Sequence, residues 1–335
     1  MGKLNFTTSN ALTKKLWDER LYRDIEKESY FSKFAGTGPD NIVHTKTQLE
    51  KSKGDSVTFG LRMRLTGAGV TDNEILEGNE ESLTTYDYSL ALKQYRHGVR
   101  DDGALTRQRA MFNCTEEMRD AIKTWGAEKL DQLHFDAVLT SPTKVAYYTT
   151  SYAVASAATA KAAMSASYPI VPKLISFAKA YASGAGDRAI GVPIRPVRVK
   201  GRDWYILLVN QEVAFDLKQN STWQGAQQYA MDRGVDNPLF TGALGAWDGV
   251  IVHEHENVDT DDDGGGSTVH YAKCVLLGAQ ALCHAWGKRM TTVQKSFDYD
   301  NEIGIAVDMM TRVGKPVFNS LDYGSLGVYV SCTNF

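Results

Sequence analysis

Residues 55–97 decide how this chain folds, and they read DSVTFGLRMRLTGAGVTDNEILEGNEESLTTYDYSLALKQYRH. Both ends of this stretch alternate between apolar and polar or small side chains, with a repeat of two. That repeat is the period of a half-buried strand. The stretch therefore predicts a long two-stranded arm with one apolar face, formed by Val57, Phe59, Leu61, Met63 and Leu65 in the first strand and Tyr86, Tyr88, Leu90 and Leu92 in the second.

The alternation changes after Lys93, where the apolar set shifts to Tyr95 and Val99, as a bulge or a twist would cause. Between the two strands lies a long tip, residues 66–82, which is rich in glycine and acidic residues. A lone hairpin is marginal in water because its apolar face has no second layer. No obvious strand follows for about a hundred residues, which leaves another copy of the chain as a candidate cover.

The composition places the chain among globular proteins, since 43% of its 335 residues are hydrophobic and 23% are charged. This length favours about two domains. No segment approaches the roughly 20 apolar residues of a membrane span, and the first ten residues lack the apolar core of a signal peptide. A net charge of −3 argues against a dedicated nucleic-acid binder. Four scattered cysteines form no C-x-x-C pair and are typical of reduced thiols.

Residues 11–35 combine many charges with large apolar side chains, among them Trp17 and Tyr22. Such an amphipathic segment needs a partner surface. Two interpretations stay open: a first helix packed on its own domain, or an arm that reaches a neighbouring subunit. Gly36 and Pro39 end the segment.

A long helix is predicted over residues 104–134, with apolar residues at helical spacing. Asn113, followed by Glu116 three residues later, could cap a second segment, which leaves two interpretations open: one continuous helix, or a break near residue 113. A helix of this length, on the order of 45 Å, would form a spine. Its apolar stripe consists of Met111, Cys114, Met118, Ile122 and Trp125.

The second half of the chain predicts short strands and helices. An alanine and serine run at 153–167 is either a small-residue helix or a loop. Pro172 is expected to begin a helix at its favoured first position, and Ser221 to begin a short helix that ends near Gly234. Strands are predicted at 204–209, 249–255, 271–277, 303–307 and 327–332.

Three patterns resemble cofactor or metal motifs, and none has the context that the motif needs. Gly184 to Ala189 matches G-x-G-x-x-A, but a helix precedes it and prolines follow it, where a dinucleotide site needs a strand and then a helix. His253 and His255 share one strand face and could share a metal, yet no third ligand is evident. We therefore interpret the two histidines as exposed strand residues.

The third pattern is the acidic segment Asp259 to Gly266, which begins like a calcium loop. The twelfth position, where a bidentate glutamate is needed, holds His270. We expect a solvated hairpin loop whose shortening leaves the fold intact. No nucleophile elbow, phosphate loop or zinc-protease motif occurs in the chain. The residues therefore favour a structural role over an enzyme and predict neither a cofactor nor a metal.

The chain resembles the major capsid proteins of tailed bacteriophages, in the family typified by short-tailed, podovirus-like phages. The resemblance covers most of the chain and rests on the number and order of several short runs. These runs are Thr47–Lys51, Gly54–Met63, Leu76–Glu81, Tyr95–His97, Phe240–Gly245 and Trp247–Val250.

The resemblance implies the α+β Johnson fold of tailed-phage capsids, with an N-terminal arm, an extended two-stranded loop, a long spine helix, and peripheral and axial domains. The order of the predicted elements matches it. The expected division is an arm at 1–43, the extended hairpin loop at 44–101, a peripheral domain with the spine helix at 102–194, an axial domain at 195–285, and a return to the peripheral domain at 286–335.

The resemblance further implies a subunit that self-assembles through hexamers and pentamers into the icosahedral head shell around double-stranded phage DNA. DNA would be contacted without sequence readout. Further partners would be scaffolding and portal proteins and a decoration protein, with no membrane. The protein would be found in the virion capsid after assembly in the host cytoplasm.

Subunit contacts are predicted for the hairpin and the N-terminal segment. The tip is acidic and the first strand carries basic residues, so an acidic tip could pair with a basic patch on the next copy; alternatively, both sets are merely solvated. The predicted interface residues are Val57, Phe59, Leu61, Arg62, Met63, Arg64, Glu77, Glu80, Glu81, Tyr86, Tyr88, Trp17 and Tyr22.

Two alternatives remain open on the sequence. One is a metal-dependent hydrolase that uses His253, His255 and the carboxylates of Asp259 to Asp263. The other is a different virion structural protein or a surface-layer protein with an alternating arm.

Overall fold

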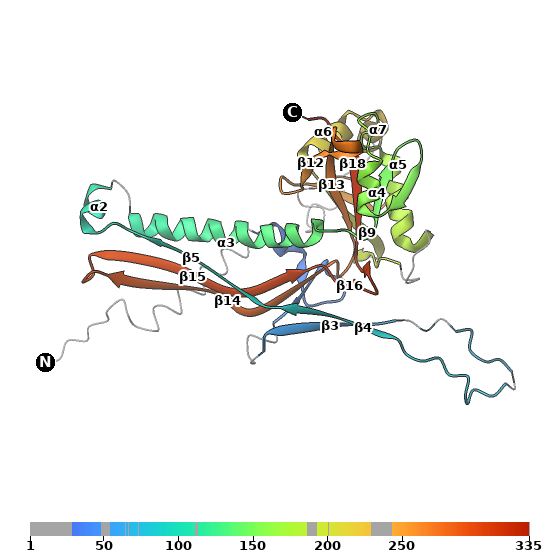
Figure 1. The fold of residues 1–335 in the computed structure, drawn as a ribbon, viewed down its shortest axis with the longest axis horizontal. Coiled ribbons are helices and arrows are strands. Elements are labelled where there is room, and N and C mark those ends of the chain that lie inside the picture. The colour runs from blue at the N-terminus through green and yellow to red at the C-terminus, as the bar shows by residue number, and fades with distance from the viewer. Residues whose placement is uncertain are drawn as a thin grey trace.

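The computed structural model describes residues 29–47, 54–63, 65, 67–72, 74–110, 113–185, 193–199, 201–228 and 243–334. Its described part has three regions (Figure 1). A long helix lies along a five-stranded sheet, a rounded body is built on a nine-stranded sheet, and a hairpin projects away from both.

The five-stranded sheet has the order β1-β2-β14-β15-β5. Its central pair, β14 and β15, is antiparallel, and β5 runs antiparallel to β15 along the far edge. The strands are β1 (Ala35–Gly36), β2 (Val43–Lys46), β5 (Lys93–Arg100), β14 (Leu282–Phe297) and β15 (Glu302–Gly314).

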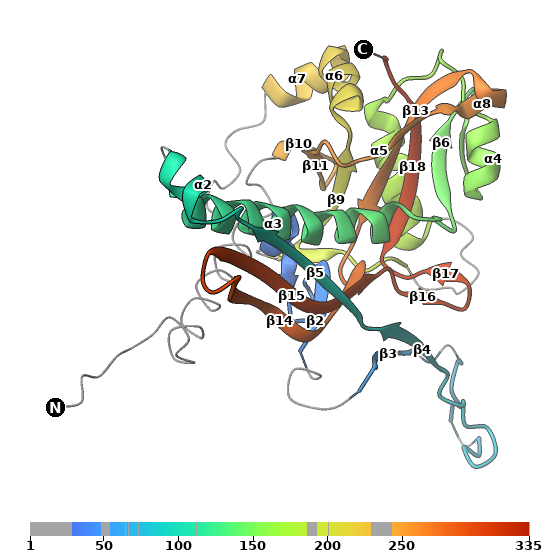
Figure 2. The same cartoon turned by 60° about the vertical axis from the view of Figure 1, so that its left-hand side comes forward.

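Helix α3 (Cys114–Leu139) is the spine of the molecule, and α2 (Ala104–Arg109) precedes it. Of the two interpretations left open by the sequence, the structure has the break near residue 113: the Asn113 side chain accepts a hydrogen bond from the backbone N–H of Thr115 and caps α3. In the first half of α3, Met118 and Ile122 are buried against β14 and β15. In the second half, Phe135 and Val138 pack in a cluster that spans both sheets. The helix therefore joins the two sheets (Figure 2).

The nine-stranded sheet has the order β10-β11-β9-β13-β18-β6-β7, with β12 paired to β13 and β8 paired to β9. Its centre is buried on both faces. Short helices cover one face, and α3 together with η1 (Tyr30–Phe34) covers the other. The strands are β6 (Val145–Tyr148), β7 (Tyr152–Ala155), β8 (Val197–Val199), β9 (Arg202–Val209), β10 (Ala243–Trp247), β11 (Val250–Glu254), β12 (Thr260–Asp263), β13 (Val269–Leu277) and β18 (Ser325–Ser331).

Short helices complete this body, and Pro172 begins one of them as predicted. The Ser221 helix is also present, although Asn220 caps it rather than Ser221. The alanine and serine run contains a helix of six residues. The helical elements are η1 (Tyr30–Phe34), α4 (Ala157–Ala162), α5 (Pro172–Ala180), η3 (Tyr181–Ala185), α6 (Gln211–Gln219), α7 (Ser221–Gln228) and α8 (Gly264–Ser267). None of the helices in the described ranges is long and apolar enough to cross a membrane.

The predicted boundaries at residues 194 and 285 do not coincide with the sheets. Residues 145–155 fall within the predicted peripheral domain at 102–194, and their strands β6 and β7 belong to the nine-stranded sheet. β18 was expected in the peripheral return, but it lies between β13 and β6 in the same sheet. The chain thus crosses between the two sheets more often than the predicted division allows, because pairing over long sequence separations leaves no local signal.

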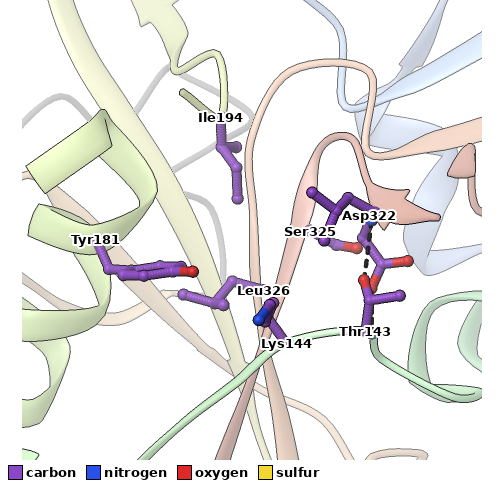
Figure 3. A pocket seen from close by; sticks show the side chains of 8 residues that line it. Thr143, Lys144, Tyr181, Ile194, Asp322, Ser325 and Leu326 are labelled. Carbon is purple, nitrogen blue, oxygen red and sulfur yellow. Dashed lines mark hydrogen bonds between the residues drawn. The ribbon is translucent and has the colours of Figure 1, made fainter. Parts of the chain in front are cut away.

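A buried ion pair holds the junction where the chain leaves α3. Lys315 Nζ donates to Asp322 Oδ2 at 3.1 Å and to the carbonyl oxygen of Thr140 at 3.0 Å. The same carboxylate oxygen accepts the N–H of Thr143 at 2.8 Å, and Thr143 Oγ1 accepts the N–H of Asp322. Asp322 ends a small hairpin of β16 (Val317–Phe318) and β17 (Leu321–Asp322). Figure 3 shows Asp322 and Thr143 beside a small pocket that Ile194 and Leu326 also line.

Two buried histidines meet between α3 and the five-stranded sheet. The rings of His134 and His284 lie 5.0 Å apart. His134 Nδ1 faces the carbonyl oxygen of Leu130 at 2.6 Å, and His284 Nε2 lies 2.7 Å from Thr311 Oγ1. Burial lowers the pKa of both imidazoles, that of His284 to well below its ordinary value, so the folded protein holds both rings neutral.

This pair predicts that the protein loses stability in mild acid. Below about pH 6.5 the unfolded chain takes up protons that the folded chain excludes, so the free energy of unfolding falls by up to about 1.4 kcal/mol per pH unit for each histidine. The contribution is fully present above pH 6.5 and is lost as the pH falls toward the lowered folded-state values. In His284→Gln, urea melts between about pH 7.5 and 5 should show a slope smaller by about one proton. An unchanged slope would contradict this account.

Candidate assembly surfaces

The projecting hairpin consists of β3 (Ser56–Arg62) and β4 (Thr85–Ala91). The strands are antiparallel, and their register places Val57 opposite Leu90, Phe59 opposite Tyr88, and Leu61 opposite Tyr86. These pairs share one face because side chains on a strand alternate with a period of two. The predicted two-stranded arm is therefore present, with its apolar face intact.

Other residues of the same chain cover part of the apolar face of the hairpin. Val57, Phe59 and Leu90 are buried in a cluster with Cys283 and Ala285 of β14. The close approach depends on a glycine, because a Cβ at Gly314 would lie only 2.5 Å from Leu90 Cδ2. The hairpin base is thus packed on its own five-stranded sheet.

This packing corrects part of the predicted interface. Val57 and Phe59 were expected to face a neighbouring subunit, but both are buried within their own chain. Tyr88 is half-buried beside Phe318, and burial raises the pKa of its phenol. The sequence does not predict this cover, because the alternation of apolar and polar residues in β14 is interrupted. The interruption lies at the register shifts near Lys288.

The tip differs from the base, because four of its large apolar side chains are exposed within the part of the chain that the structure describes. Beyond Arg62 the ladder ends with one hydrogen bond from the N–H of Met63 to the carbonyl oxygen of Thr84. Ile75 is 72% exposed and Leu76 is 57% exposed, and Leu65 and Leu83 are also exposed. Exposed large apolar residues grouped on a projecting element are typical of an interaction site.

The charges of the tip are partly engaged in local turns. Glu80 Oε2 accepts the N–H of Gly78 at 2.8 Å, and Glu81 Oε2 accepts the N–H of Gly67 at 2.6 Å. Glu77 and Arg62 are exposed. The basic side chain of Lys46 in β2 lies beside the hairpin and donates to the carbonyl oxygen of Thr58.

The remaining predicted interface residues divide into two groups. Leu61, Met63 and Tyr86 are half-buried at the distal end of the hairpin. Trp17, Tyr22 and Arg64 lie outside the residues that the structure describes.

The two histidines of the alternative hydrolase do not form the expected exposed pair. His253 is fully buried on β11, and His255 is half-buried. Their rings pack near Tyr30, whose centroid lies 4.6 Å from that of His255. Burial lowers the pKa of His255. Neither histidine belongs to a group of three or more possible metal ligands among the described residues.

The acidic segment 259–266 is also not a free loop. Residues Thr260 to Asp263 form β12, which pairs with β13. Asp261 forms an ion pair with Lys273, and Asp263 forms one with Lys161. Lysines therefore occupy two of the carboxylates that a calcium loop would need. The expectation of a solvated hairpin loop is therefore wrong for residues 260–263. Shortening the segment would remove a strand that pairs with β13.

Comparisons with known proteins agree with one another. A model of the phage capsid protein family matches residues 5–329. The major capsid protein of Pseudomonas phage KPP25 is 27% identical over 380 residues, covering 98% of each chain. The capsid of Ralstonia phage GP4 has a TM-score of 0.81 at 24% identity and 99% coverage of both chains. The capsid of cyanophage Pam1 has a TM-score of 0.72 at 19% identity, covering 99% of this chain and 100% of its own.

These matches extend over nearly the whole chain, and the structural likeness supports the tailed-phage capsid fold that the family resemblance implied. The hydrolase alternative finds no support in them or in the positions of His253 and His255. The chain belongs to the phage capsid protein family, and its function is that of a bacteriophage major capsid protein.

Proposed function

We propose that the subunit assembles through hexamers and pentamers, and that each hairpin tip lies on the neighbouring subunit within the ring. The observation that carries this proposal is the contrast along one hairpin: the base is buried in its own chain, and Ile75 and Leu76 at the tip are exposed. Around a closed ring, the same contact repeats head to tail, so every tip finds a cover.

The proposed cover is the groove between β3 of the next subunit and the residues of its β2 and β16. Residues His44, Leu61 and Phe318 line a pocket there, beside Gly60 and Pro316. Its walls are mainly apolar, which suits an aliphatic side chain from a neighbouring tip. Arg62 lies exposed at the same end of β3 and would meet the acidic tip, which would fix orientation more than affinity.

The same proposal assigns the two sheets to domains. The five-stranded sheet with α3 would be the peripheral domain, and the nine-stranded body would be the axial domain near the ring centre. Scaffolding, portal and decoration proteins, packaged double-stranded DNA and assembly in the host cytoplasm belong to the proposal as expected partners and setting. A net charge of −3 suits DNA held by confinement, without sequence readout.

The tip contact is tested by replacing Ile75 and Leu76 together with aspartate. We expect a folded, soluble subunit that forms no shells, because two charges would have to be buried in the apolar contact. Electron microscopy and sedimentation of the expressed protein measure assembly, and the melting temperature measures folding. Neither residue is buried in the subunit, so the melting temperature should change little.

The matched control is Ile75→Val with Leu76→Met, which keeps both side chains apolar and should still form shells. Normal shells from the aspartate variant would show that the tip does not carry the contact. Absence of assemblies from the unmodified chain, alone or with its scaffolding protein, would remove the proposal itself.

A further inference from the structure

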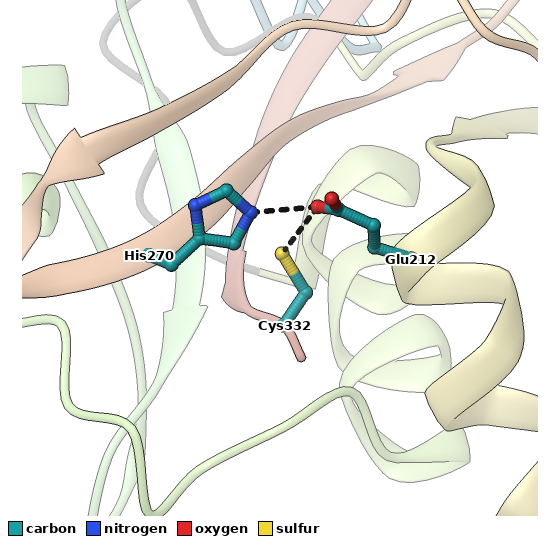
Figure 4. A group of neighbouring side chains, drawn as sticks. All are labelled: Glu212, His270 and Cys332. Atoms are coloured by element: carbon teal, nitrogen blue, oxygen red, sulfur yellow. Dashed lines mark hydrogen bonds and ion pairs between the residues drawn. The ribbon is translucent and has the colours of Figure 1, made fainter. Parts of the chain in front are cut away.

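Three side chains from distant parts of the chain converge at the top of the nine-stranded body. Glu212 comes from α6, His270 from β13, and Cys332 follows β18 (Figure 4). Their possible ligand atoms all lie within 4.8 Å of one another, and all three residues are half-buried. This is the one such group among the described residues. The capsid function derived above does not use it.

Backbone pairing fixes this convergence. β13 and β18 are antiparallel neighbours, and the N–H of Cys332 donates to the carbonyl oxygen of His270 at 3.3 Å. Asn210 caps α6 by accepting from the N–H of Glu212 at 3.1 Å, which sets the glutamate in the first turn. The three residues are therefore held by two strands and a helix start, and do not depend on a loose loop.

The distances suit a tetrahedral ion. For zinc with bond lengths of about 2.3 Å to sulfur and about 2.0 Å to nitrogen or oxygen, ligand atoms lie roughly 3.3–3.6 Å apart. Cys332 Sγ lies 3.5 Å from Glu212 Oε2, which already fits. His270 Nε2 lies 2.6 Å from the same oxygen, as in a hydrogen bond, so an ion between them requires these atoms to separate by less than 1 Å.

The second nitrogen of the imidazole has the partner that a metal-bound histidine needs. His270 Nδ1 lies 2.5 Å from Asp262 Oδ1. A carboxylate at the far nitrogen fixes the tautomer and directs the lone pair of Nε2 toward the ion. Here that direction is toward Glu212 and Cys332.

The alternative to a bound metal ion is that protons occupy the side chains of His270 and Cys332. Burial alone would lower the pKa of His270, but the hydrogen bonds that its ring donates to Glu212 and Asp262 outweigh burial and raise the pKa. Burial and the charge of Glu212 raise the pKa of Cys332. A divalent cation would bind the deprotonated thiolate and the neutral imidazole, and its charge would balance that of the glutamate and the thiolate.

We propose that Glu212, His270 and Cys332 bind one Zn²⁺ ion, with water at the fourth position and Asp262 as the supporting carboxylate. The ion would be structural. It would tie the end of the chain to α6, where Thr333 already donates its N–H and its hydroxyl to Asp216.

The test uses the full-length purified protein, stripped of metal and then given Zn²⁺. We expect one zinc per chain after gel filtration, measured by elemental analysis, and a higher melting temperature. Co²⁺ in place of Zn²⁺ should give the absorption of a tetrahedral site with a thiolate-to-metal band. Because this spectrum is recorded on the unmodified chain, it does not depend on whether a variant folds.

Variants then assign the ligands. Cys332→Ser should lose the thiolate band and stoichiometric zinc, and Asp262→Asn should weaken zinc binding by about 10–100-fold. The matched control is Cys114→Ser, which removes another half-buried thiol far along the chain and should bind zinc normally. No retained zinc on the unmodified protein, or full zinc binding by Cys332→Ser, would overturn the proposal and leave His270 as a hydrogen-bonded bridge between Asp262 and Glu212.

Discussion

Replacing Asp322 with alanine is expected to lower the free energy of unfolding by about 3–5 kcal/mol, because it leaves a buried ammonium group without its counter-charge. The side chains of Lys315 and Asp322 are only 6% and 3% exposed. The same change removes the acceptor of the Thr143 N–H, where the chain leaves α3 and enters β6. Chemical denaturation of the purified subunit measures the loss.

The control is the double variant Lys315→Met with Asp322→Leu. It removes both charges together and should cost far less than Asp322→Ala, since a buried ion pair is often replaceable by apolar residues of similar volume. If Asp322→Ala and the double variant melted alike, the unpaired charge would not be the cause. An unchanged melting temperature for Asp322→Ala would show that water reaches the pair.

Replacing Ile122 with alanine is expected to destabilise the subunit by about 2–5 kcal/mol, the range for deleting a buried aliphatic side chain and leaving a cavity. Ile122 is fully buried in a cluster with Met118, Trp286 and Met309, which joins α3 to the five-stranded sheet. The structure favours this position over Trp125, which is only half-buried and stacks on His97.

Thr124→Ala is the matched control on the same helix. Its side chain is exposed, and its hydroxyl donates only to the carbonyl oxygen of Asp120 within the helix. Because alanine is the better helix former, this variant should melt within about 0.5 kcal/mol of the unmodified protein. Equal stability of the two variants would mean that the face of α3 at Ile122 is not a packed core.

The elements with strong local signals were predictable from the sequence. Alternation in residues 56–62 and 85–91 predicted both hairpin strands, and Asn113 predicted the start of α3. β14 and α6 were missed. In β14, register shifts interrupt the period of two. The signal for α6 was present, since Asn210 is a capping residue and Val213, Ala214 and Leu217 have helical spacing.

Sequence reasoning could not find the features that depend on long-range pairing. Glu212, His270 and Cys332 are separated by tens of residues and match no motif, so only the β13–β18 register brings two of them together. The exposed Ile75 and Leu76 lie outside both alternating strands, so the period of two gave no signal for them. A projecting loop with two adjacent large aliphatic residues was the signal that would have found them.

The hairpin and the five-stranded sheet are connected by an almost continuous strand, so force on one is transmitted to the other. β4 ends at Ala91 and β5 begins at Lys93, so a single residue separates the projecting strand from the strand that pairs with β15. That residue, Leu92, donates its N–H to the carbonyl oxygen of Asp55 at 2.8 Å, which closes the root of the hairpin. A load applied at the tip by a neighbouring subunit would pass along this backbone into the sheet beneath α3. We therefore expect the hairpin to change its angle to the five-stranded sheet at Leu92 if the curvature of the shell changes.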